Sequence, residues 1–331
     1  MGNATNTFLS SCSKIDFGII DISGQKKCFY QKFNAQIISL CDTLPESVQT
    51  DALLFFMNYS GLSIGQELTF FKNYYTPSWS IVFWLTRFFP DNNRSFREKT
   101  KAAITAHSMA MMLHSLDDHI NDGELRASHL TLLLRSQAWM MMSDSLKSLS
   151  GGANNSKRII SDFIDDYYSG ILASDDPETL DNYCTLFKKQ MATWSIVPVL
   201  LSKIINKDDS FSNDVQAAFE SFGIAWRLLD DINDIHLDMK NGTHSAVYIC
   251  LPGEAKKLWD QNKKNGLSAE DASHDTILNH IINTRLIEKI HKKICRELQS
   301  AVLISEKINL VGLADELRCL LSPLKDRQIL I

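Results

Sequence analysis

Apolar residues recur at helical spacing along nearly the whole chain, and no segment keeps the two-residue alternation of a half-buried strand. Spacings of three and four residues place apolar side chains on one face of an α-helix. Prolines and glycine pairs separate these segments, as expected where helices end. The pattern predicts helices at 37–41, 48–59, 68–75, 78–89, 94–121, 128–149, 154–171, 180–205 and 214–238.

The two ends of the chain follow the pattern less regularly. Residues 1–25 predict an irregular N-terminal arm, and residues 246–321 predict three or four shorter helices with a polar link around 262–274. Pro198 predicts a kink inside the helix at 180–205. Because the chain has neither a linker nor a repeat, we expect one helical domain over 26–331. The fold class is therefore all-α, a single-domain bundle around a central cavity.

Composition narrows the class of protein. The 331 residues are 44% hydrophobic and 22% charged, with few glycines (14) and prolines (7), which is typical of a soluble helical protein. A net charge of −5 gives no indication of nucleic-acid binding. The seven cysteines form no close pair, which predicts a reduced, cytoplasmic chain whose cysteines are mostly buried. No signal peptide is evident, and no apolar run is long enough for a membrane span.

Two aspartate-rich stretches carry the chemistry. Asp117-Asp118 is followed by Asp122, and Asp230-Asp231 is followed by Asp234 and Asp238. Residues four apart share a helix face, so Asp118 and Asp122 align, and the second stretch presents one carboxylate per turn. Like charges in a row repel one another unless a cation neutralises them. A hard divalent ion, usually Mg²⁺, takes such oxygen ligands and shares its shell with phosphates.

Other double aspartates are less informative. Asp208-Asp209 and Asp175-Asp176 lie among Ser, Pro and Asn, which predicts solvated loop or cap positions. Asp165-Asp166 fits the polar face of an ordinary amphipathic helix.

The two motifs resemble those of the trans-isoprenyl diphosphate synthases. Asp117-Asp118 through Asp122, followed by Arg126, is similar to the first aspartate-rich motif of that family, and Trp226-Arg227 through Asp234 resembles its second. The resemblance covers about 68–245 and implies the class I isoprenoid synthase fold, with a prenyl diphosphate substrate and three Mg²⁺ ions. It also implies metal ligation by both motifs and catalytic roles for three aspartates. The metal ligands would be Asp117, Asp118, Asp122, Asp230, Asp231, Asp234 and Asp238, and the catalytic residues Asp117, Asp118 and Asp230.

Cationic residues near the motifs are candidates for binding the diphosphate. They are Arg126, Lys189, Arg227 and Lys240. The chain departs from the chain-elongating members at two places. Those members carry an N-terminal Gly-Gly-Lys-Arg run for isopentenyl diphosphate that is missing here, and Trp226-Arg227 replaces their Phe-Gln. The sequence therefore predicts ionisation of a finished farnesyl or geranylgeranyl diphosphate.

The fate of the resulting cation stays open. Cyclisation, as in terpene synthases, needs aromatic faces that attract cations. Transfer to another acceptor is suggested because 70–77 and 117–149 resemble the prenyltransferases that build the moenomycin lipid, and chain elongation is a third alternative. Candidate pocket residues are Met109, Met112, Leu113, Trp79, Phe83, Trp194 and Trp226. The resemblance also implies a homodimer, and a catalytically inactive partner subunit is the non-enzyme alternative.

Overall fold

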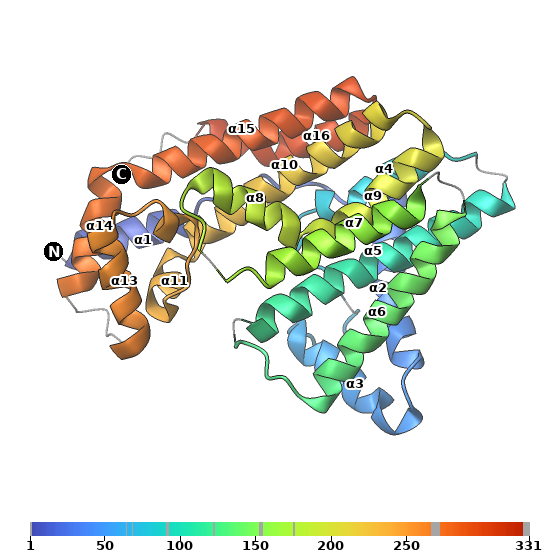
Figure 1. The fold of residues 1–331 in the computed structure, drawn as a ribbon, viewed down its shortest axis with the longest axis horizontal. Helices are drawn as coiled ribbons and strands as arrows, with labels where there is room; N and C mark the ends of the chain where they lie inside the picture. Colours follow the sequence, from blue (N-terminus) through green and yellow to red (C-terminus); the bar gives the residue numbers. More distant parts are fainter. Residues whose placement is uncertain are drawn as a thin grey trace.

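A computed structural model describes residues 2–63, 65–67, 69–90, 93–121, 123–151, 155–174, 176–265 and 272–326. Within these ranges the chain forms helices joined by turns, without a strand (Figure 1). The helices are α1 Gly2–Cys12, α2 Gly24–Asp42, α3 Glu46–Tyr59, α4 Pro77–Thr86, α5 Arg94–Asn121, α6 His129–Ser150, α7 Ser156–Ile171, α8 Leu180–Gln190, α9 Ala192–Ile205, α10 Asp209–Asn233, α11 Ile235–Asn241, α12 Ala246–Ile249, α13 Gly253–Asn265, α14 Ala272–Asn283, α15 Leu286–Lys307 and α16 Val311–Asp326. The predicted all-α class is confirmed.

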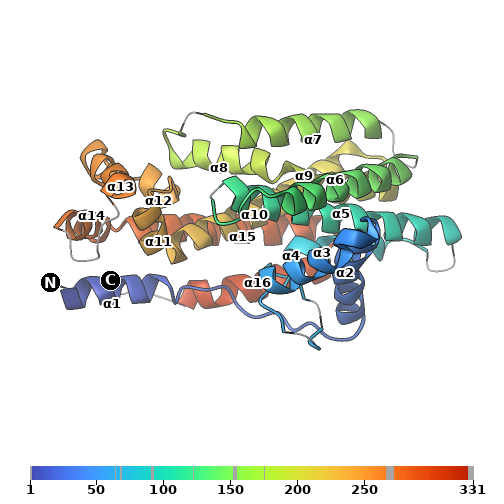
Figure 2. The same ribbon diagram turned by 90° about the horizontal axis from the view of Figure 1, so that it is seen from below.

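The longest helices pack in pairs. α10 packs along α15, and α5 packs along α6, while α7, α8 and α9 form an adjoining layer. Figure 2 shows α7 and α8 on one side of α5, α10 and α15, with α16 and α1 on the other. α5 and α10 run in the same direction, so their C-terminal ends lie toward the same end of the molecule (Figure 1). Both acidic motifs therefore meet at that end.

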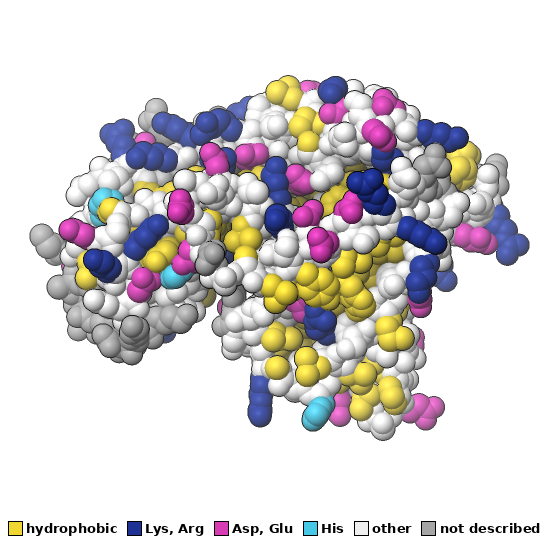
Figure 3. Space-filling view, viewed as in Figure 1, with side chains coloured by type: hydrophobic (Ala, Val, Ile, Leu, Met, Phe, Trp, Pro, Cys, Tyr) yellow, Lys and Arg dark blue, Asp and Glu magenta, His cyan; other side chains and the backbone are white. Residues whose placement is uncertain are grey.

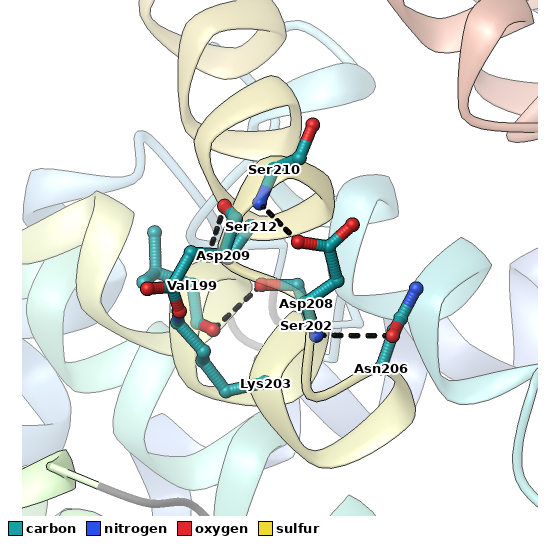
Figure 4. A network of polar contacts seen from close by, with 8 residues as sticks. All are labelled: Val199, Ser202, Lys203, Asn206, Asp208, Asp209, Ser210 and Ser212. Atoms are coloured by element: carbon teal, nitrogen blue, oxygen red, sulfur yellow. Dashed lines mark hydrogen bonds and ion pairs between the residues drawn. The ribbon is translucent and has the colours of Figure 1, made fainter.

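Several helices begin and end where their residues dictate. Ser128 and Thr131 form a reciprocal capping box at the start of α6. Gly242 adopts a left-handed φ of 66° and terminates α11. At the start of α10, Asp208 accepts from the Ser210 N–H at 3.0 Å, and Asn206 accepts from the Asp208 N–H at 3.1 Å (Figure 4). The predicted cap role of Asp208 is confirmed.

The prediction of a helix at 68–75 is wrong. Residues 69–75 form turns, with single bonds from Lys72 to Thr69 (3.2 Å) and from Tyr74 to Phe71 (3.1 Å). The Phe71 N–H is bonded at 3.3 Å to the Asn34 side chain of α2, and Pro77 begins the next helix. The Asn34 side chain thus takes the place of the backbone carbonyl that would accept from the Phe71 N–H in a helix. The spacing of apolar residues near Phe71 does not reveal this contact.

The predicted helix at 180–205 is divided at Met191, and Pro198 lies inside α9. Close packing around two glycines coincides with the position of the break. A Cβ on Gly170 would lie 2.8 Å from the backbone N of Gln190, and one on Gly223 would lie 2.4 Å from the Met191 sulfur. The two glycines let α7 and α10 approach the α8–α9 joint from both sides.

The N-terminal arm is more ordered than the sequence predicts. Gly2–Cys12 is helical, and Phe8, Cys12 and Phe17 are buried. Gly18 donates to the Leu320 carbonyl at 3.1 Å, so the arm follows α16. The N-terminal arm has too few apolar residues to give a clear helical pattern. Those few are nevertheless enough to attach the arm to the bundle.

Some hydrophobic side chains lie on the surface. Figure 3 shows hydrophobic side chains gathered over the region of α6, where Leu132 and Met140 are exposed. The implied homodimer stays a prediction.

No helix among the described residues is long and apolar enough to span a membrane. All seven cysteines are free, but only three are buried (Cys12, Cys41 and Cys184), so the prediction that most are buried is wrong.

Candidate active site

Asp117 and Asp118 of the first acidic motif lie in the last two turns of α5, and the second motif occupies the end of α10 and the start of α11. Apolar neighbours fix the orientation of both helices, since Leu113, Leu116, Leu228 and Leu229 are buried. The carboxylates stand at the edge of this apolar core. Burial of that kind is costly for a charged group unless it is paired.

Asp117 is held by two side chains from neighbouring helices. Arg135 of α6 contacts both of its oxygens, with Nε on Oδ1 and Nη2 on Oδ2 at 2.9 Å. Tyr167 of α7 donates to Oδ2 at 2.5 Å. The hydrogen bond to Asp117 raises the pKa of Arg135, and burial, with Asp117 close by, raises the pKa of Tyr167. Asp117 therefore links α5, α6 and α7, and its oxygens are already engaged.

Asp231 has an equivalent environment in the second motif. Tyr183 of α8 donates to it at 2.7 Å, the Ala246 N–H of α12 donates at 3.0 Å, and Arg227 Nε lies 3.2 Å from its Oδ1. Its side chain is only 2% exposed, and burial raises its pKa. In each Asp-Asp pair, one carboxylate is thus anchored by a tyrosine and an arginine.

The other member of each pair is influenced by the opposite motif. Burial, together with the charges of Asp231, Asp234 and Asp118, raises the pKa of Asp230 to about 7 against the influence of Arg227. Asp118 on α5 and Asp230 on α10 are therefore close enough to sense each other's charge. The two motifs therefore lie near each other.

The second motif keeps its row of carboxylates although the helix breaks at Asp234. The Asp234 N–H bonds to the Asp230 carbonyl at 2.9 Å, and the Asp238 N–H bonds to the Asp234 carbonyl at 2.8 Å. Burial raises the pKa of Asp238 to about 8, with Asp231 and Asp234 adding to the effect. The pKa of Asp234 is also raised, chiefly by burial. The row is thus a site of unfavourable negative charge.

The predicted diphosphate-binding cations are not equivalent. Arg126, Lys189 and Lys240 are exposed. Arg227 alone of the four lies within the acidic cluster, with its side chain 26% exposed. Asp122, the remaining predicted metal ligand, lies outside the described residues.

An aromatic cluster adjoins the carboxylates. The Trp194 and Trp226 ring centroids are 5.3 Å apart, and the Tyr74 ring lies 5.8 Å from Trp194 and 5.9 Å from Trp226. His114, one turn before Asp118, packs edge-on against Trp194 at 4.6 Å. These rings pack against one another beside the acidic motifs, with Trp194 fully buried and Tyr74 and Trp226 partly buried.

The other predicted pocket residues are distributed differently. Met109, Met112 and Leu113 are buried on α5, in the turns before Asp117. Trp79 and Phe83 of α4 belong to a separate cluster, at 6.2 Å and 5.5 Å from Phe29 of α2. The contacts place these two rings in the core between α2 and α4.

Sequence reasoning missed the three anchoring side chains Arg135, Tyr167 and Tyr183. One signal was available, because Arg135 follows an apolar run, 132–134, within a helix. A charged residue there needs a partner. The two tyrosines had no comparable signal, since aromatic residues fit any amphipathic helix.

The donor set fits a hard divalent cation. Asp118, Asp230, Asp234 and Asp238 offer only carboxylate oxygens, the ligands that Mg²⁺ prefers. The raised pKa values of Asp230 and Asp238 indicate that a positive charge there would be stabilising. Within the described part of the chain, no three His, Cys, Asp or Glu side chains lie close enough to form a complete metal site.

Comparison with known proteins places the fold. Neither the protein-family models nor the curated proteins give a match. Among solved structures, geranylgeranyl pyrophosphate synthase from Lactobacillus brevis matches with a TM-score of 0.64 and 13% identity, over 88% of this chain and 96% of that one. Polyprenyl synthetase from Streptomyces coelicolor matches at 0.62 and 10% identity, over 92% and 99%.

A third structure is of interest for its ligands. Geranylgeranyl pyrophosphate synthase from Corynebacterium glutamicum, complexed with isoprenyl diphosphate and magnesium, matches with a TM-score of 0.57 and 12% identity, over 91% of this chain and 99% of that one. The likeness extends over whole chains, so the predicted isoprenoid synthase fold is confirmed.

Proposed function

We propose that the protein is an enzyme that ionises an allylic prenyl diphosphate, farnesyl or geranylgeranyl diphosphate, and cyclises the resulting cation to a terpene. One observation carries the proposal: Asp118 and Asp230 lie near the C-terminal ends of α5 and α10, close enough for the charge of Asp118 to raise the pKa of Asp230, and an aromatic cluster adjoins them. Acidic residues there suit a metal-bound diphosphate, and the rings suit an apolar cationic chain.

Each group in the site has a role in this proposal. Asp118, Asp230, Asp234 and Asp238 would hold Mg²⁺, which when bound neutralises the diphosphate and makes it a better leaving group. Asp117 and Asp231, whose oxygens are engaged, would position the helices that carry these ligands. Arg227 would face the diphosphate. Trp194, Trp226 and Tyr74 would exclude water and stabilise positive charge on the chain.

Chain elongation is a second candidate, because the structures with the same fold are prenyl diphosphate synthases. The absence of the Gly-Gly-Lys-Arg run and the replacement of Phe-Gln by Trp226-Arg227 favour cyclisation. Transfer of the prenyl group to a non-isopentenyl acceptor is the third possibility. It is suggested by the sequence resemblance alone.

One set of incubations separates the candidates. The purified protein is given farnesyl or geranylgeranyl diphosphate with Mg²⁺, and pyrophosphate release and extracted products are measured with and without isopentenyl diphosphate. A cyclase forms a hydrocarbon or terpene alcohol without a second substrate, whereas an elongating enzyme forms a longer diphosphate only when isopentenyl diphosphate is present. Slow hydrolysis alone would favour transfer. Failure to release pyrophosphate under every condition would refute the enzyme assignment, with Asp118→Asn as the inactive control.

A further inference from the structure

Arg227 is paired with the carboxylates of the second acidic motif. Its Nε lies 3.2 Å from Asp231 Oδ1, and its Nη1 lies 4.0 Å from Asp230 Oδ2. Nε also donates to the Tyr183 hydroxyl at 3.0 Å, and the guanidinium lies 6.0 Å from the centre of the Phe187 ring. A side chain held by this many contacts is fixed in place before any ligand arrives.

The first motif also acts on Arg227 from the opposite helix. Burial disfavours the cation, yet the surrounding groups outweigh this and raise the pKa of Arg227 well above its usual range; they are Tyr183, Asp231, Asp118 and Asp230. An arginine stays charged under all ordinary conditions. The carboxylates therefore share a permanent positive charge before a metal binds.

We propose that Arg227 is a resident cation of the acidic site, which weakens the binding of free Mg²⁺ and leaves the metal to enter together with diphosphate. This inference rests on the proposed function. The fixed guanidinium already offsets part of the negative charge of Asp118 and Asp230, so a metal ion binds to these carboxylates less favourably. When diphosphate binds, its charge offsets that of Arg227, and Mg²⁺ binding becomes favourable. The arginine makes the two ligands bind cooperatively.

The location of the other candidate cations supports assigning this role to Arg227. Arg126, Lys189 and Lys240 are exposed, so solvent screens their charges from the carboxylates. Arg227 is about one-quarter exposed and directly paired with the second motif. Because Arg227 is not one of the proposed metal ligands, a substitution can remove its charge and leave those carboxylates in place.

Isothermal titration with Mg²⁺, with and without inorganic pyrophosphate, tests the inference. Arg227→Gln removes the charge, and Arg227→Lys retains it. We expect Arg227→Gln to bind Mg²⁺ about tenfold more tightly than the wild type when pyrophosphate is absent. Pyrophosphate should then strengthen Mg²⁺ binding less than it does in the wild type. Arg227→Lys should stay close to the wild type in both respects.

A matched control separates charge from local structure. Tyr183→Phe removes a hydroxyl that contacts both Arg227 and Asp231 but keeps the guanidinium, so its Mg²⁺ affinity should change little. Near-ultraviolet circular dichroism checks that each variant is folded. Unchanged or weaker Mg²⁺ binding by folded Arg227→Gln would overturn the inference, as would an equal gain in Arg227→Lys. A wild type that binds no Mg²⁺ even with pyrophosphate would instead refute the proposed function.

Discussion

The Tyr167 hydroxyl donates a 2.5 Å hydrogen bond to the Asp117 carboxylate, and this bond separates the roles of two adjacent aspartates. With Arg135 on the same carboxylate, Asp117 is engaged toward α6 and α7. Asp118 influences groups on α10 instead. Tyr183 and Asp231 repeat the arrangement in the second motif. An Asp-Asp pair on a helix can thus supply one structural carboxylate and one that remains available to a ligand.

This division predicts different outcomes for Asp117→Asn and Asp118→Asn. Asp117→Asn weakens a largely buried, charge-assisted pair with Arg135, so we expect a loss of about 1–3 kcal/mol in the free energy of unfolding. Asp118→Asn should leave stability unchanged or raise it, because a repelling charge is removed, while abolishing Mg²⁺-dependent pyrophosphate release. Urea unfolding and a pyrophosphate assay measure the two effects.

Tyr167→Phe is the matched control for the anchor. It removes one hydrogen bond and should cost about 1 kcal/mol, with Mg²⁺ binding retained. Equal loss of stability in Asp117→Asn and Asp118→Asn would contradict the division of roles.

Mg²⁺ affinity should depend on pH near neutrality. The raised pKa values of Asp230 (about 7) and Asp238 (about 8) mean that protons occupy these ligands at pH 6. Metal binding must displace both protons, so we expect Mg²⁺ to bind more than about a hundredfold more tightly at pH 8 than at pH 6. Titration calorimetry at both values measures this. Asp238→Asn should flatten the dependence, and an equally steep profile in that variant would assign the protons to other groups.

The same groups affect the stability of the metal-free protein. Because their folded pKa values exceed the ordinary aspartate value of 3.8, their protonated forms favour the folded state. Their stabilising contribution is complete below about pH 4 and is lost as the pH rises through 7 and 8. Bound Mg²⁺ should compensate for this loss at alkaline pH.

Local spacing predicts most of the fold because the helices carry their own signals. The predicted 94–121 helix coincides with α5, and the stop at Gly242 is encoded by its left-handed backbone. The predicted helices are wrong where contacts with residues distant in the sequence determine the structure. The Asn34 side chain takes the Phe71 N–H, and packing around Gly170 and Gly223 coincides with the division at Met191. No local pattern contains those contacts.

The candidate site shows the same limit. The acidic motifs could be recognised, since rows of carboxylates are unusual within apolar helices, whereas Trp194 and Trp226 could be named only among several aromatic candidates. The sequence could not distinguish Asp117 from Asp118, because the distinction depends on Arg135 and Tyr167 from other helices. Trp79 could not be separated from Trp194 either, since both are fully buried aromatic residues.

His107 should make the protein sensitive to acid. It is fully buried, its ring Nε2 lies 2.6 Å from the Ser78 carbonyl, and burial lowers its pKa to about 4. A lowered folded pKa contributes stability that is present above about pH 6.5 and is lost as the pH falls toward 4. Between pH 7 and 5 the loss should be about 2 kcal/mol.

His107→Gln tests this assignment, since glutamine can donate to Ser78 and does not titrate. The variant should lose less stability than the wild type between pH 7 and pH 5 in urea unfolding. The same acid loss in both proteins would exclude His107 as the group responsible.

Gly312 should be intolerant of a side chain. A Cβ there would lie 2.2 Å from the Trp84 ring, so Gly312→Ala must displace the indole that packs α4 against α16. We expect a loss of about 1–3 kcal/mol in the free energy of unfolding and a shift in tryptophan fluorescence. Gly253→Ala is the control, because no atom lies within 4 Å of its added Cβ. It should be neutral or slightly stabilising, and similar losses in both variants would exclude the contact with Trp84 as the cause.

Trp226 should contribute to the reaction through its ring face rather than through the fold. Its ring lies 5.3 Å from Trp194 and is partly buried next to the acidic motifs, where a prenyl cation would form under the proposed function. A cation over an aromatic face gains about 0.5–2 kcal/mol, so Trp226→Leu should lower kcat about 2- to 30-fold with little change in KM. Trp226→Phe should retain most of the activity. Trp79→Leu provides the comparison, because Trp79 packs against Phe29 in the other cluster and its loss should reduce the melting temperature while leaving kcat unchanged. If Trp79→Leu lowered kcat as much as Trp226→Leu in folded protein, the aromatic contribution would not be specific to the cluster beside Asp118 and Asp230.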